Sequence, residues 1–516
     1  MNRDTNATKK PNIIFMLVDD LGYADIGYRN DNEIDTPHLN SIVARGLDLE
    51  RYYVHCVCSP SRGALMTGRF AHHLGLHNWL WPANNIAVEL DEVFLPEKLK
   101  EVGYKTHMIG KWHLGHHKWG YTPNYRGFDT YYGYYTGGGD YYMGLCDTQR
   151  LWFQYLDAKK PKCSDEPSCV RIPWEAQGRY STEVFGEKAV EIIDNHNTSE
   201  PLFLYLAFQA VHAGFFQPDQ VPPRYVEPYE NRIPPGKRRQ FAGMLSAVDM
   251  AVGKVLEALE RNGFTDDNTL IIVSTDNGGP VFVGDGVGSR NTPFRGGKHA
   301  LYEGGVRGVA FIAGYGIQQR GGTYPGLMHI SDWFATLADV AGYSLDTKKP
   351  LDGVSHWERL SAPPGKTFDG PALRTKVVLG NVSDHGIGFG VLYDDEDGKT
   401  WKIITGTPGY PPFLSDEAPD LLHGDKGKPC HNGFCLFEIQ SDPIEQYDLA
   451  LNASYASKLD EMRKRLLEEW ATAHHLVPDC DIQPIPKFEE HVHYAWWPYC
   501  DKDGSPLGND AILQER

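Results

Sequence analysis

Four apolar runs, each ending in polar residues, constrain the fold of this chain more than any other feature. They occupy residues 12–18, 105–109, 202–208 and 269–274. Near-continuous apolar strands are typical of a sheet that is buried on both faces. Because the carboxyl ends of parallel strands meet at one edge of such a sheet, we expect the polar residues that follow the runs to lie together there.

Helical patterns separate these runs. Apolar residues recur at helical spacing from Phe241 to Leu259, and Asn262-Gly263 then supplies a stop signal. Residues 182–195 and 331–341 are expected to form further helices. Strands that alternate with helices predict an α/β fold, here an α/β/α sandwich.

The character of the sequence changes near residues 350–372, where Gly and Pro interrupt the chain repeatedly. Beyond them, residues 389–393 and 401–405 flank a turn and predict a hairpin, and residues 435–439 predict another strand. Apolar residues from Leu459 to Trp470 indicate an amphipathic helix. A chain of 516 residues is long enough for two domains. We expect a large domain at 1–370 and a smaller C-terminal α+β domain, an antiparallel sheet with a helix, at 371–516.

Charge and hydropathy exclude two classes of partner. The formal net charge of −18 argues against nucleic acid. No apolar run approaches the roughly 18 residues that a membrane span needs. Residues 1–11 are polar and lack the apolar segment of a signal peptide, so either the protein is cytosolic or its signal sequence is missing from this numbering.

Sequons and cysteines favour the second option. Asn-x-Ser/Thr sequons begin at Asn6, Asn197, Asn381 and Asn452. The chain has nine cysteines, and without Cys58 an even number remains, which suits disulfides in an oxidising compartment. We therefore expect a secreted or lysosomal protein.

The cysteines other than Cys58 are candidates for disulfides, although spacing alone leaves their connectivity open. Plausible pairs are Cys430 with Cys435, and Cys163 with Cys146 or Cys169. Cys480 and Cys500 are expected to tie a tail from Pro478 onward to the surface. The remaining member of the set is Cys56.

One segment carries most of the chemical information. Residues 58–69 read Cys-Ser-Pro-Ser-Arg-Gly-Ala-Leu-Met-Thr-Gly-Arg. In isolation Cys58 would be interpreted as a disulfide partner or a buried thiol. With Pro60 and Arg62 at these offsets, however, the segment resembles the signature of the type I sulfatases. In that family the cysteine is oxidised after translation to formylglycine, an aldehyde that serves as the catalytic nucleophile.

The resemblance implies a reaction. The hydrated aldehyde carries two hydroxyls, of which one attacks sulfur and expels the alcohol. Loss of a proton from the second hydroxyl then releases sulfate and restores the aldehyde, a step that serine or a thiol cannot perform. Pro60 and Arg62 would be read by the formylglycine-generating enzyme during maturation, and Arg62 would also stabilise the charged diol.

Acidic pairs after two of the runs suggest a metal site. Asp19-Asp20 and Asp276-Asn277 could each be an ordinary turn. Together they offer carboxylate and amide oxygens, which suit Ca²⁺, or less favourably Mg²⁺, rather than zinc. The resemblance implies that these four residues hold calcium beside the modified Cys58, where the cation would polarise the sulfate and the nucleophile.

Several cationic side chains match further family segments. Lys111 and His113, in Gly-Lys-Trp-His, are expected to point to one side of a strand extension. By resemblance, Lys111 binds the sulfate and His113 hydrogen-bonds the nucleophile and accepts its proton. His212 would contact the sulfate and assist the leaving alcohol. Lys298 would bridge the sulfate and the leaving oxygen as a general acid.

The resemblance extends over nearly the whole chain. Within the family, segments such as residues 106–115, 127–131, 201–212 and 304–308 look most similar to arylsulfatase B, an N-acetylgalactosamine-4-sulfatase. Family members share an alkaline-phosphatase-like α/β fold with a smaller C-terminal domain, in agreement with the pattern above.

Loops rather than the motifs are expected to choose the substrate. Residues 131–142, rich in Tyr and Gly, are interpreted as a mobile aromatic rim, and residues 77–81 as another wall. Such walls suit a sulfated sugar, an aryl sulfate or another sulfated metabolite. Two alternatives remain: a hydrolase of phosphate or phosphonate esters, and a sulfated-glycan-binding protein without turnover.

Overall fold

The computed structural model describes residues 10–476 with gaps at 82–85, 143–152, 156–169, 172, 215–219, 282–287, 381–387, 407, 409–429 and 431–432. A ten-stranded sheet forms its centre, in the order β11-β2-β10-β9-β1-β8-β4-β5-β6-β7. The innermost strands are β1 (Asn12–Val18), β8 (Leu202–Ala207), β4 (Lys105–Lys111) and β9 (Thr269–Thr275). These strands are parallel to their neighbours among the four, which confirms the expectation from the apolar runs.

Shorter strands extend the sheet on both sides. On one side β5 (Thr130–Tyr134) pairs parallel with β4 and is followed by antiparallel β6 (Phe153–Tyr155) and β7 (Val170–Arg171). On the other, β10 (Ala310–Gly314) is antiparallel to β9, and β2 (Gly46–Leu49) and β11 (Gly322–Tyr324) complete the edge. The sheet is therefore mixed outside its parallel centre.

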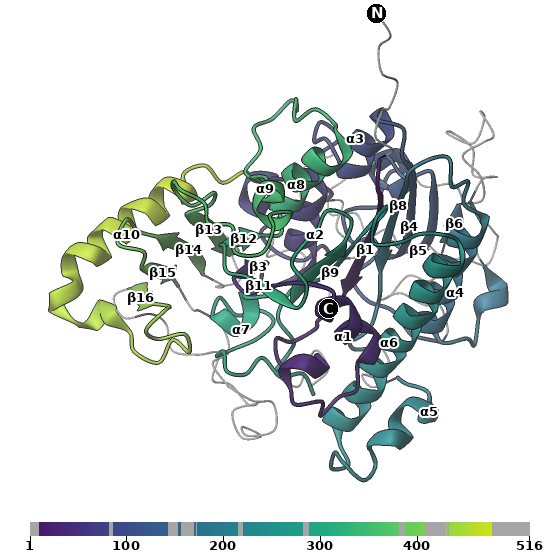
Figure 1. Cartoon of the computed structure of the whole chain (residues 1–516). Helices are drawn as coiled ribbons and strands as arrows, with labels where there is room; N and C mark the ends of the chain where they lie inside the picture. Colours follow the sequence, from purple (N-terminus) through teal and green to yellow (C-terminus); the bar gives the residue numbers. More distant parts are fainter. Residues whose placement is uncertain are drawn as a thin grey trace, which may run out of the picture.

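Helices cover both faces of this sheet, as Figure 1 shows. Ile14, Met16 and Val18 of β1 face one apolar core, whereas Ile13, Phe15 and Leu17 face the other. The first core is closed by α1 (Pro37–Ala44), α4 (Ser181–Asn195) and α6 (Lys237–Arg261). The second is closed by α2 (Cys58–Thr67), α3 (Leu95–Glu101) and α8 (Asp332–Ala341). The predicted α/β/α sandwich and its helices at 182–195, 241–259 and 331–341 are confirmed.

Short elements connect these layers. They are the helices α5 (Pro223–Val226), α7 (Glu303–Val306) and α9 (Trp357–Leu360), the 3₁₀ turn η2 (Ala71–Leu74), and the two-stranded sheet of β3 (Tyr52–Tyr53) and β12 (Met328–His329).

A second, antiparallel sheet lies beside the sandwich, with the yellow helix of Figure 1 packed on it. Its strands are β13 (Lys376–Gly380), β14 (Phe389–Asp394), β15 (Thr400–Thr405) and β16 (Phe434–Glu438), in that order. The helix α10 (Ala456–Trp470) buries Met462 and Leu466 against the sheet. The predicted hairpin, third strand and helix are confirmed, and the domain boundary near residue 370 stays a prediction.

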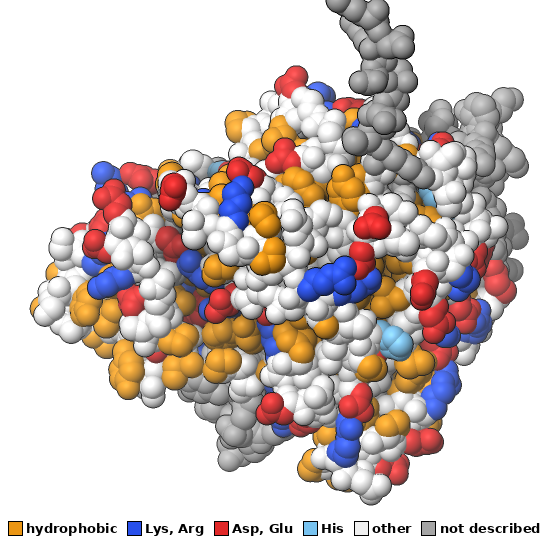
Figure 2. All heavy atoms as spheres, viewed as in Figure 1, with side chains coloured by type: hydrophobic (Ala, Val, Ile, Leu, Met, Phe, Trp, Pro, Cys, Tyr) orange, Lys and Arg blue, Asp and Glu red, His pale blue; other side chains and the backbone are white. Residues whose placement is uncertain are grey.

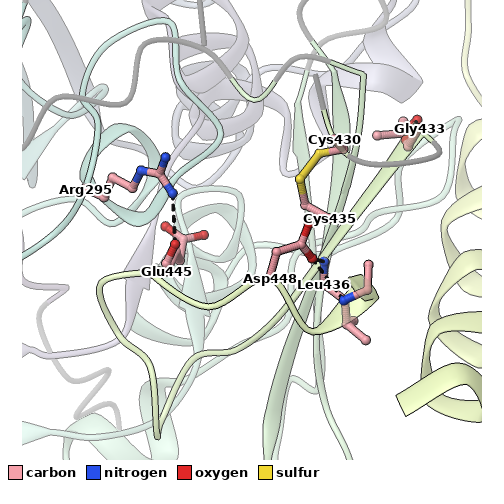
Figure 3. Close-up of a disulfide and its surroundings, with 9 residues drawn as sticks. Arg295, Cys430, Gly433, Cys435, Leu436, Glu445 and Asp448 are labelled. Atoms are coloured by element: carbon pink, nitrogen blue, oxygen red, sulfur yellow. Dashed lines mark hydrogen bonds between the residues drawn. A yellow bond between two sulfur atoms is a disulfide. The ribbon is translucent and has the colours of Figure 1, made fainter. Parts of the chain in front are cut away.

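The cysteine expectations have a mixed outcome. Cys430 and Cys435 form a disulfide, shown in Figure 3. Cys56, in contrast, is a buried free thiol, so its expected disulfide is wrong. It lies in an apolar core with Val57 and Leu301. A buried free cysteine packs there as a small apolar side chain and needs no disulfide partner. Cys146, Cys163, Cys169, Cys480, Cys500 and the tail from Pro478 lie outside the described residues.

Two features of the described surface bear on charge and hydropathy. On the face in Figure 2, Lys and Arg side chains are scattered among Asp and Glu rather than gathered into a basic patch. Among the described residues, no helix has the length and apolar character needed to cross a bilayer.

Candidate active site

The carboxyl ends of β1 and β9 bring two acidic pairs together. Val18 of β1 pairs with Thr275 of β9 in parallel register, so the residues that follow each strand lie side by side. Asp19, Asp20, Asp276 and Asn277 are fully buried there. The backbone NH of Asp20, which has a φ of 62°, donates to Asp276 Oδ1 at 3.2 Å. Sequence positions 256 residues apart thus form one acidic site.

Cys58 is the first residue of α2 and points at this site. Its Sγ lies 3.8 Å from Asp19 Oδ1. The start of a helix carries partial positive charge and free NH groups, which favour an anion. Burial raises the pKa of the Cys58 thiol to about 12 despite the nearby Lys111 ammonium. The unmodified side chain would therefore be a neutral thiol, which is a weak nucleophile.

Each aspartate of the site has a cationic partner. Arg62 donates to Asp276 Oδ2 from Nε at 3.0 Å and from Nη2 at 2.8 Å. Lys111 Nζ lies 2.6 Å from Asp19 Oδ2, and Lys298 Nζ lies 2.9 Å from Asp20 Oδ2. Three buried carboxylates are thus balanced by three buried cations.

Electrostatics keep this cluster charged although it is buried. Burial opposes ionisation of Asp19, but the Lys111 ammonium and the Arg62 guanidinium outweigh it and hold the pKa of Asp19 below its ordinary value. Burial likewise opposes the charged form of Lys111, and Asp19 in turn raises the pKa of that ammonium. Such buried pairs persist because each partner compensates the desolvation of the other.

Arg62 makes several contacts within the site. Beyond Asp276, its Nη1 donates to the carbonyl of Lys111 at 2.9 Å, and its Nη2 lies 3.3 Å from Asp19 Oδ2. These contacts use all three guanidinium nitrogens, so Arg62 holds the carboxylates and the end of β4 together. A direct role of Arg62 on the nucleophile stays a prediction.

The donor set fits a hard cation. Asn277 Nδ2 donates to Asp20 Oδ1 at 2.7 Å, while its buried Oδ1 has no hydrogen-bond partner among the described residues. An unpaired buried amide oxygen is costly unless a ligand completes it. Ligand atoms of Asp19, Asp20, Cys58 and His212 also lie within 4.8 Å of one another. The oxygens of this cluster suit calcium better than a softer metal.

His113 lies next to the cluster, but the argument that placed it there is wrong. Strand β4 ends at Lys111, and His113 has a φ of 62°, so the alternation of side chains along a strand does not apply. Its Nε2 hydrogen-bonds the carbonyl of Leu80 at 2.9 Å. Burial, and then the Lys111 charge, hold the pKa of His113 well below its usual value.

The hydrogen bond to Leu80 also fixes the tautomer of His113. A neutral imidazole that donates from Nε2 to a carbonyl has an acceptor at Nδ1. That Nδ1 is buried and finds no partner in the described part of the chain. His113 therefore offers a free lone pair inside the site.

His212 follows β8 and is half-buried at the edge of the cluster. Its Nδ1 lies 2.9 Å from the carbonyl of Ala213, which leaves Nε2 facing Asp20 Oδ2 at 3.8 Å. The hydroxyl of Tyr141 donates to the His212 carbonyl at 2.7 Å and supports this loop.

The Tyr-rich segment is not the mobile rim that its composition suggested. Tyr131, Tyr132 and Tyr134 lie on β5 and are buried, and Tyr141 is fully buried as well. Because β5 pairs with β4 inside the sheet, Tyr131 points into one apolar core, and Tyr132 and Tyr134 point into the other. Composition alone does not reveal this pairing.

Two glycines of this segment nevertheless shape the site. A Cβ at Gly137 would lie 2.7 Å from the His113 ring, and one at Gly138 would lie 3.5 Å from the His212 ring. The run of glycines after Thr136 was visible in the sequence, but its use as a close packing surface was not predicted. Residues 77–81 were expected to form another wall, but the contact of Leu80 with His113 was not predicted, because Leu80 acts through its backbone.

Comparisons with known proteins agree on one family. The family model described as Sulfatase matches residues 11–343. Arylsulfatase J of Mus musculus is 36% identical over 512 residues, covering 96% of this chain and 81% of the relative. The N-acetylgalactosamine-6-sulfatase of Homo sapiens is 28% identical over 374 residues, covering 68% of this chain and 66% of the relative.

Solved structures share the fold. Ps i-CgsB superposes with a TM-score of 0.70 at 28% identity, covering 90% of this chain and 94% of that one. The PsFucS1 sulfatase from Pseudoalteromonas sp. superposes with a TM-score of 0.67 at 22% identity, covering 90% of each chain, and supports the fold alone. The α/β sandwich with its C-terminal antiparallel sheet is thus consistent with the expected alkaline-phosphatase-like architecture.

Proposed function

Because this chain belongs to the sulfatase family and is a sulfuric ester hydrolase, we propose that it cleaves sulfate monoesters with a formylglycine made from Cys58 and a bound Ca²⁺. The observation that carries this proposal is the balance of buried charge around Cys58. Each of three buried aspartates forms an ion pair with its own cation: Asp19 with Lys111, Asp20 with Lys298, and Asp276 with Arg62. A cluster of this kind can accept a cation and an anion together.

The two halves of the cluster suit the two charges. The three carboxylates, with the unpaired Oδ1 of Asn277, would hold calcium. The ammonium groups of Lys111 and Lys298 form ion pairs with Asp19 and Asp20 in this structure, and they would bind the sulfate once calcium neutralises the carboxylates. Calcium supplies a Lewis acid that lowers the pKa of a nearby hydroxyl.

The remaining side chains supply orientation and proton transfer. Lys298 Nζ would donate a proton to the leaving oxygen, with His212 Nε2 beside it. The free Nδ1 of His113 would accept the proton lost from the nucleophile. Formylglycine supplies a hydrated aldehyde as the nucleophile, and its formation requires a formylglycine-generating enzyme as a maturation partner.

We propose a sulfated sugar as the natural substrate. Named relatives include N-acetylgalactosamine-6-sulfatase, and Ps i-CgsB has a solved complex with k-i-k-neocarrahexaose. That this sequence is, within the family, most similar to arylsulfatase B stays a prediction. Aryl sulfates would serve as small reporter substrates.

We also propose a secreted or lysosomal location. The Cys430–Cys435 disulfide would persist in an oxidising compartment. The sequon residues Asn197 and Asn452 are exposed and accessible to a glycosyltransferase, whereas Asn6 and Asn381 lie outside the described residues.

Mass spectrometry of the tryptic peptide 52–62, from protein made together with a formylglycine-generating enzyme, tests the nucleophile. We expect an aldehyde or its hydrate at Cys58, and sulfate release that the Cys58→Ala variant loses by about 10⁴-fold or more. An unmodified thiol in a competent host would contradict the proposal. Faster turnover of an aryl phosphate than of the matching aryl sulfate would favour the phosphohydrolase alternative. Sulfated-ligand binding without turnover, with the aldehyde present, would favour the binding-protein alternative.

A further inference from the structure

Asn291 is a buried amide that hydrogen-bonds backbone groups beside the active site. Its Nδ2 donates to the carbonyl of Gly279 at 2.9 Å and to that of Gly296 at 3.1 Å. Its Oδ1 accepts from the NH of Gly279 at 2.9 Å and from that of Tyr23 at 3.4 Å. The side chain is fully buried, so water does not compete for these bonds. A side-chain amide has two donor hydrogens and two acceptor lone pairs, and here all of them are used.

These hydrogen bonds join two segments that carry proposed site residues. Gly279 lies two positions after Asn277, a proposed calcium ligand, and Gly296 lies two positions before Lys298, the proposed general acid. The NH of Lys298 donates directly to the carbonyl of Gly279 at 3.1 Å. Asn291 and Lys298 therefore share one backbone acceptor, and Asn291 also holds the chain just before Lys298.

The two segments approach each other closely at Gly297. A Cβ at this position would lie 2.3 Å from the carbonyl oxygen of Gly279 and 2.9 Å from Asn291 Nδ2. Both distances are shorter than a real Cβ tolerates. The backbone next to Lys298 is thus packed directly against the loop that follows β9, and the Asn291 amide fixes it there.

The side chain of Lys298 completes a ring of contacts. Its Nζ lies 2.9 Å from Asp20 Oδ2, and Asp20 Oδ1 accepts from Asn277 Nδ2 at 2.7 Å. Lys298 is therefore tied to the segment of Asn277 at its backbone and at its ammonium group. Calcium at the proposed site would compete for Asp20 and weaken the tie at the ammonium group. The position of Lys298 would then depend on the backbone contacts that Gly279 and Asn291 provide.

On the basis of the proposed sulfatase function, we propose that Asn291 is a positioning residue that places the Lys298 ammonium at the leaving oxygen of the sulfate ester. In that reaction the ammonium gives its proton to the leaving oxygen as the bond from this oxygen to sulfur breaks and the nucleophile bonds to sulfur. Lys298 is left as a neutral amine. Proton transfer needs the two atoms within hydrogen-bond distance, and a misplacement of about 1 Å can cost about 10²-fold in rate. The inference deepens the proposed function by naming the residue that holds its general acid in place.

The basicity of the leaving group separates a misplaced general acid from general damage. 4-Nitrophenyl sulfate has a weakly basic leaving group and needs little protonation, whereas phenyl sulfate has a more basic one and needs more. The proteins are made together with a formylglycine-generating enzyme. For Asn291→Ala we expect kcat to fall about tenfold on 4-nitrophenyl sulfate and about 100-fold on phenyl sulfate, with KM changed less than about threefold. Lys298→Ala should also lose more on phenyl sulfate, and adding Asn291→Ala to it should cost little more.

Asn12 supplies the matched control. Its buried amide also joins two backbone segments, donating to the carbonyl of Asn268 at 3.1 Å and accepting from the NH of Leu202 at 3.0 Å. It begins β1, at the opposite end of that strand from Asp19. Asn12→Ala and Asn291→Ala should both lower the melting temperature, because each removes buried hydrogen bonds. Asn12→Ala should leave the ratio of the two substrates unchanged.

Two results would overturn the positioning role of Asn291. Equal losses of Asn291→Ala on the two substrates, or no loss, would show that the residue is only structural. If Asn291→Ala does not fold, Asn291→Asp is measured in its place, since it keeps the shape and the acceptor but loses both donors. Failure of both variants to fold would also assign Asn291 to the fold alone.

The wild type and Lys298→Ala separate this inference from the proposed function. If the wild type cleaves both substrates and Lys298→Ala loses equally on both, Lys298 is not the general acid. The positioning role then fails while the sulfatase function stands. If the wild type, with the aldehyde confirmed at position 58, cleaves neither substrate, the proposed function itself fails.

Discussion

The catalytic cluster around Cys58 and a second group of buried charges differ in how completely their atoms are paired. The second group, here called the junction cluster, consists of Glu303, Lys402 and Glu445 and joins α7 to the C-terminal sheet. Lys402 Nζ lies 3.0 Å from Glu303 Oε1 and 2.8 Å from Glu445 Oε1. Glu303 Oε2 accepts from Tyr53 at 2.8 Å, and Glu445 Oε2 accepts from the NH of Glu303 at 2.6 Å.

Each carboxylate oxygen of the junction cluster lies within 3.0 Å of a donor or cationic atom of the chain, although Glu445 Oε1 faces only the Lys402 ammonium, in an ion pair that lacks hydrogen-bond geometry. In the catalytic cluster, Asn277 Oδ1 has no hydrogen-bond partner among the described residues. Complete pairing is what a structural ion cluster needs, because an unpaired buried charge is costly. The unpaired oxygen of Asn277 is a neighbour of the buried carboxylates around Cys58, where a bound cation would complete it. The comparison teaches that the partner available to each buried oxygen, rather than burial or charge alone, distinguishes the two clusters: Glu445 Oε1 has the Lys402 ammonium, whereas Asn277 Oδ1 has no hydrogen-bond partner among the described residues.

The junction cluster also reaches the segment that carries Lys298. Arg295 Nη1 donates to the carbonyl of Glu445 at 2.9 Å, a hydrogen bond drawn as a dashed line in Figure 3. Glu303 follows at the start of α7. The C-terminal sheet thus clamps the segment between Arg295 and Glu303 from outside the active site.

Removing Lys402 should break the junction cluster as a structural unit. The variant Lys402→Met leaves Glu303 and Glu445 buried without their shared cation, and we expect the free energy of unfolding to fall by about 3–5 kcal/mol. Urea denaturation measures this loss. Lys464→Met, which changes an exposed lysine of α10, is the matched control and should have little effect. A change below about 1 kcal/mol in Lys402→Met would contradict a structural role.

Lys298→Ala should have the opposite effect: it should reduce turnover strongly and change stability little. Loss of the proposed proton donor and sulfate contact should lower kcat about 10³-fold, roughly 4 kcal/mol of transition-state stabilisation. The thermal midpoint should change little, because Asp20 keeps Asn277 as a partner and would remain beside the proposed calcium site. Steady-state kinetics with an aryl sulfate, together with a melting curve, make the comparison. Wild-type-like turnover would remove Lys298 from the mechanism.

The junction cluster should also make stability depend on pH. Burial, together with the negative charge of Glu303, raises the pKa of Glu445 to about 7 from 4.5, even though Lys402 opposes this shift. Between these values the folded state holds the proton more tightly than the unfolded state. Stability is therefore lost as the pH rises from about 4.5 to 7, by about 3 kcal/mol.

Glu445→Gln tests this dependence because it removes the titrating group while keeping the shape. We expect the variant to lose the decline in unfolding free energy between pH 4.5 and 7 that the wild type shows. Glu468→Gln, at an exposed glutamate of α10, should retain the wild-type slope. Identical slopes in Glu445→Gln and the wild type would show that another group causes the dependence.

Calcium removal should affect only the catalytic cluster. A cation that binds the folded state at about 100 times its Kd stabilises it by about 2.7 kcal/mol. We expect chelation to lower the melting temperature of the wild type and of Lys402→Met by similar amounts. The variant Asn277→Ala, which lacks the unpaired amide oxygen, should show a smaller shift. A shift of wild-type size in Asn277→Ala would argue against that oxygen as a ligand.

Sequence reasoning succeeded where the signal is local. Apolar runs such as residues 12–18 predicted their strands because near-continuous hydrophobicity requires burial on both faces. The motif after Cys58 pointed to the chemistry because its residues occupy consecutive positions of one helix. The acidic residues Asp19 and Asp276 could be placed together because parallel strands end at one edge.

Predictions from composition and local pattern were wrong where contacts with distant segments determine the burial or orientation of a side chain. The tyrosines near Tyr132 were expected at a mobile rim, yet pairing of β5 with β4 buries them. Cys56 was expected in a disulfide, yet it fills an apolar core. His113 was placed by strand alternation, whereas a left-handed backbone conformation after β4 sets its direction.

By itself the sequence determined the order of strands and helices, the sulfatase signature and the set of candidate site residues, because these depend on periodicity and on adjacent positions. Only the tertiary structure decided that Leu80 holds His113, that Lys402 pairs with Glu303 across 99 positions, and that Asn277 Oδ1 stays unpaired. Which polar atoms find partners depends on contacts between distant segments, and those contacts exist only after the chain has folded.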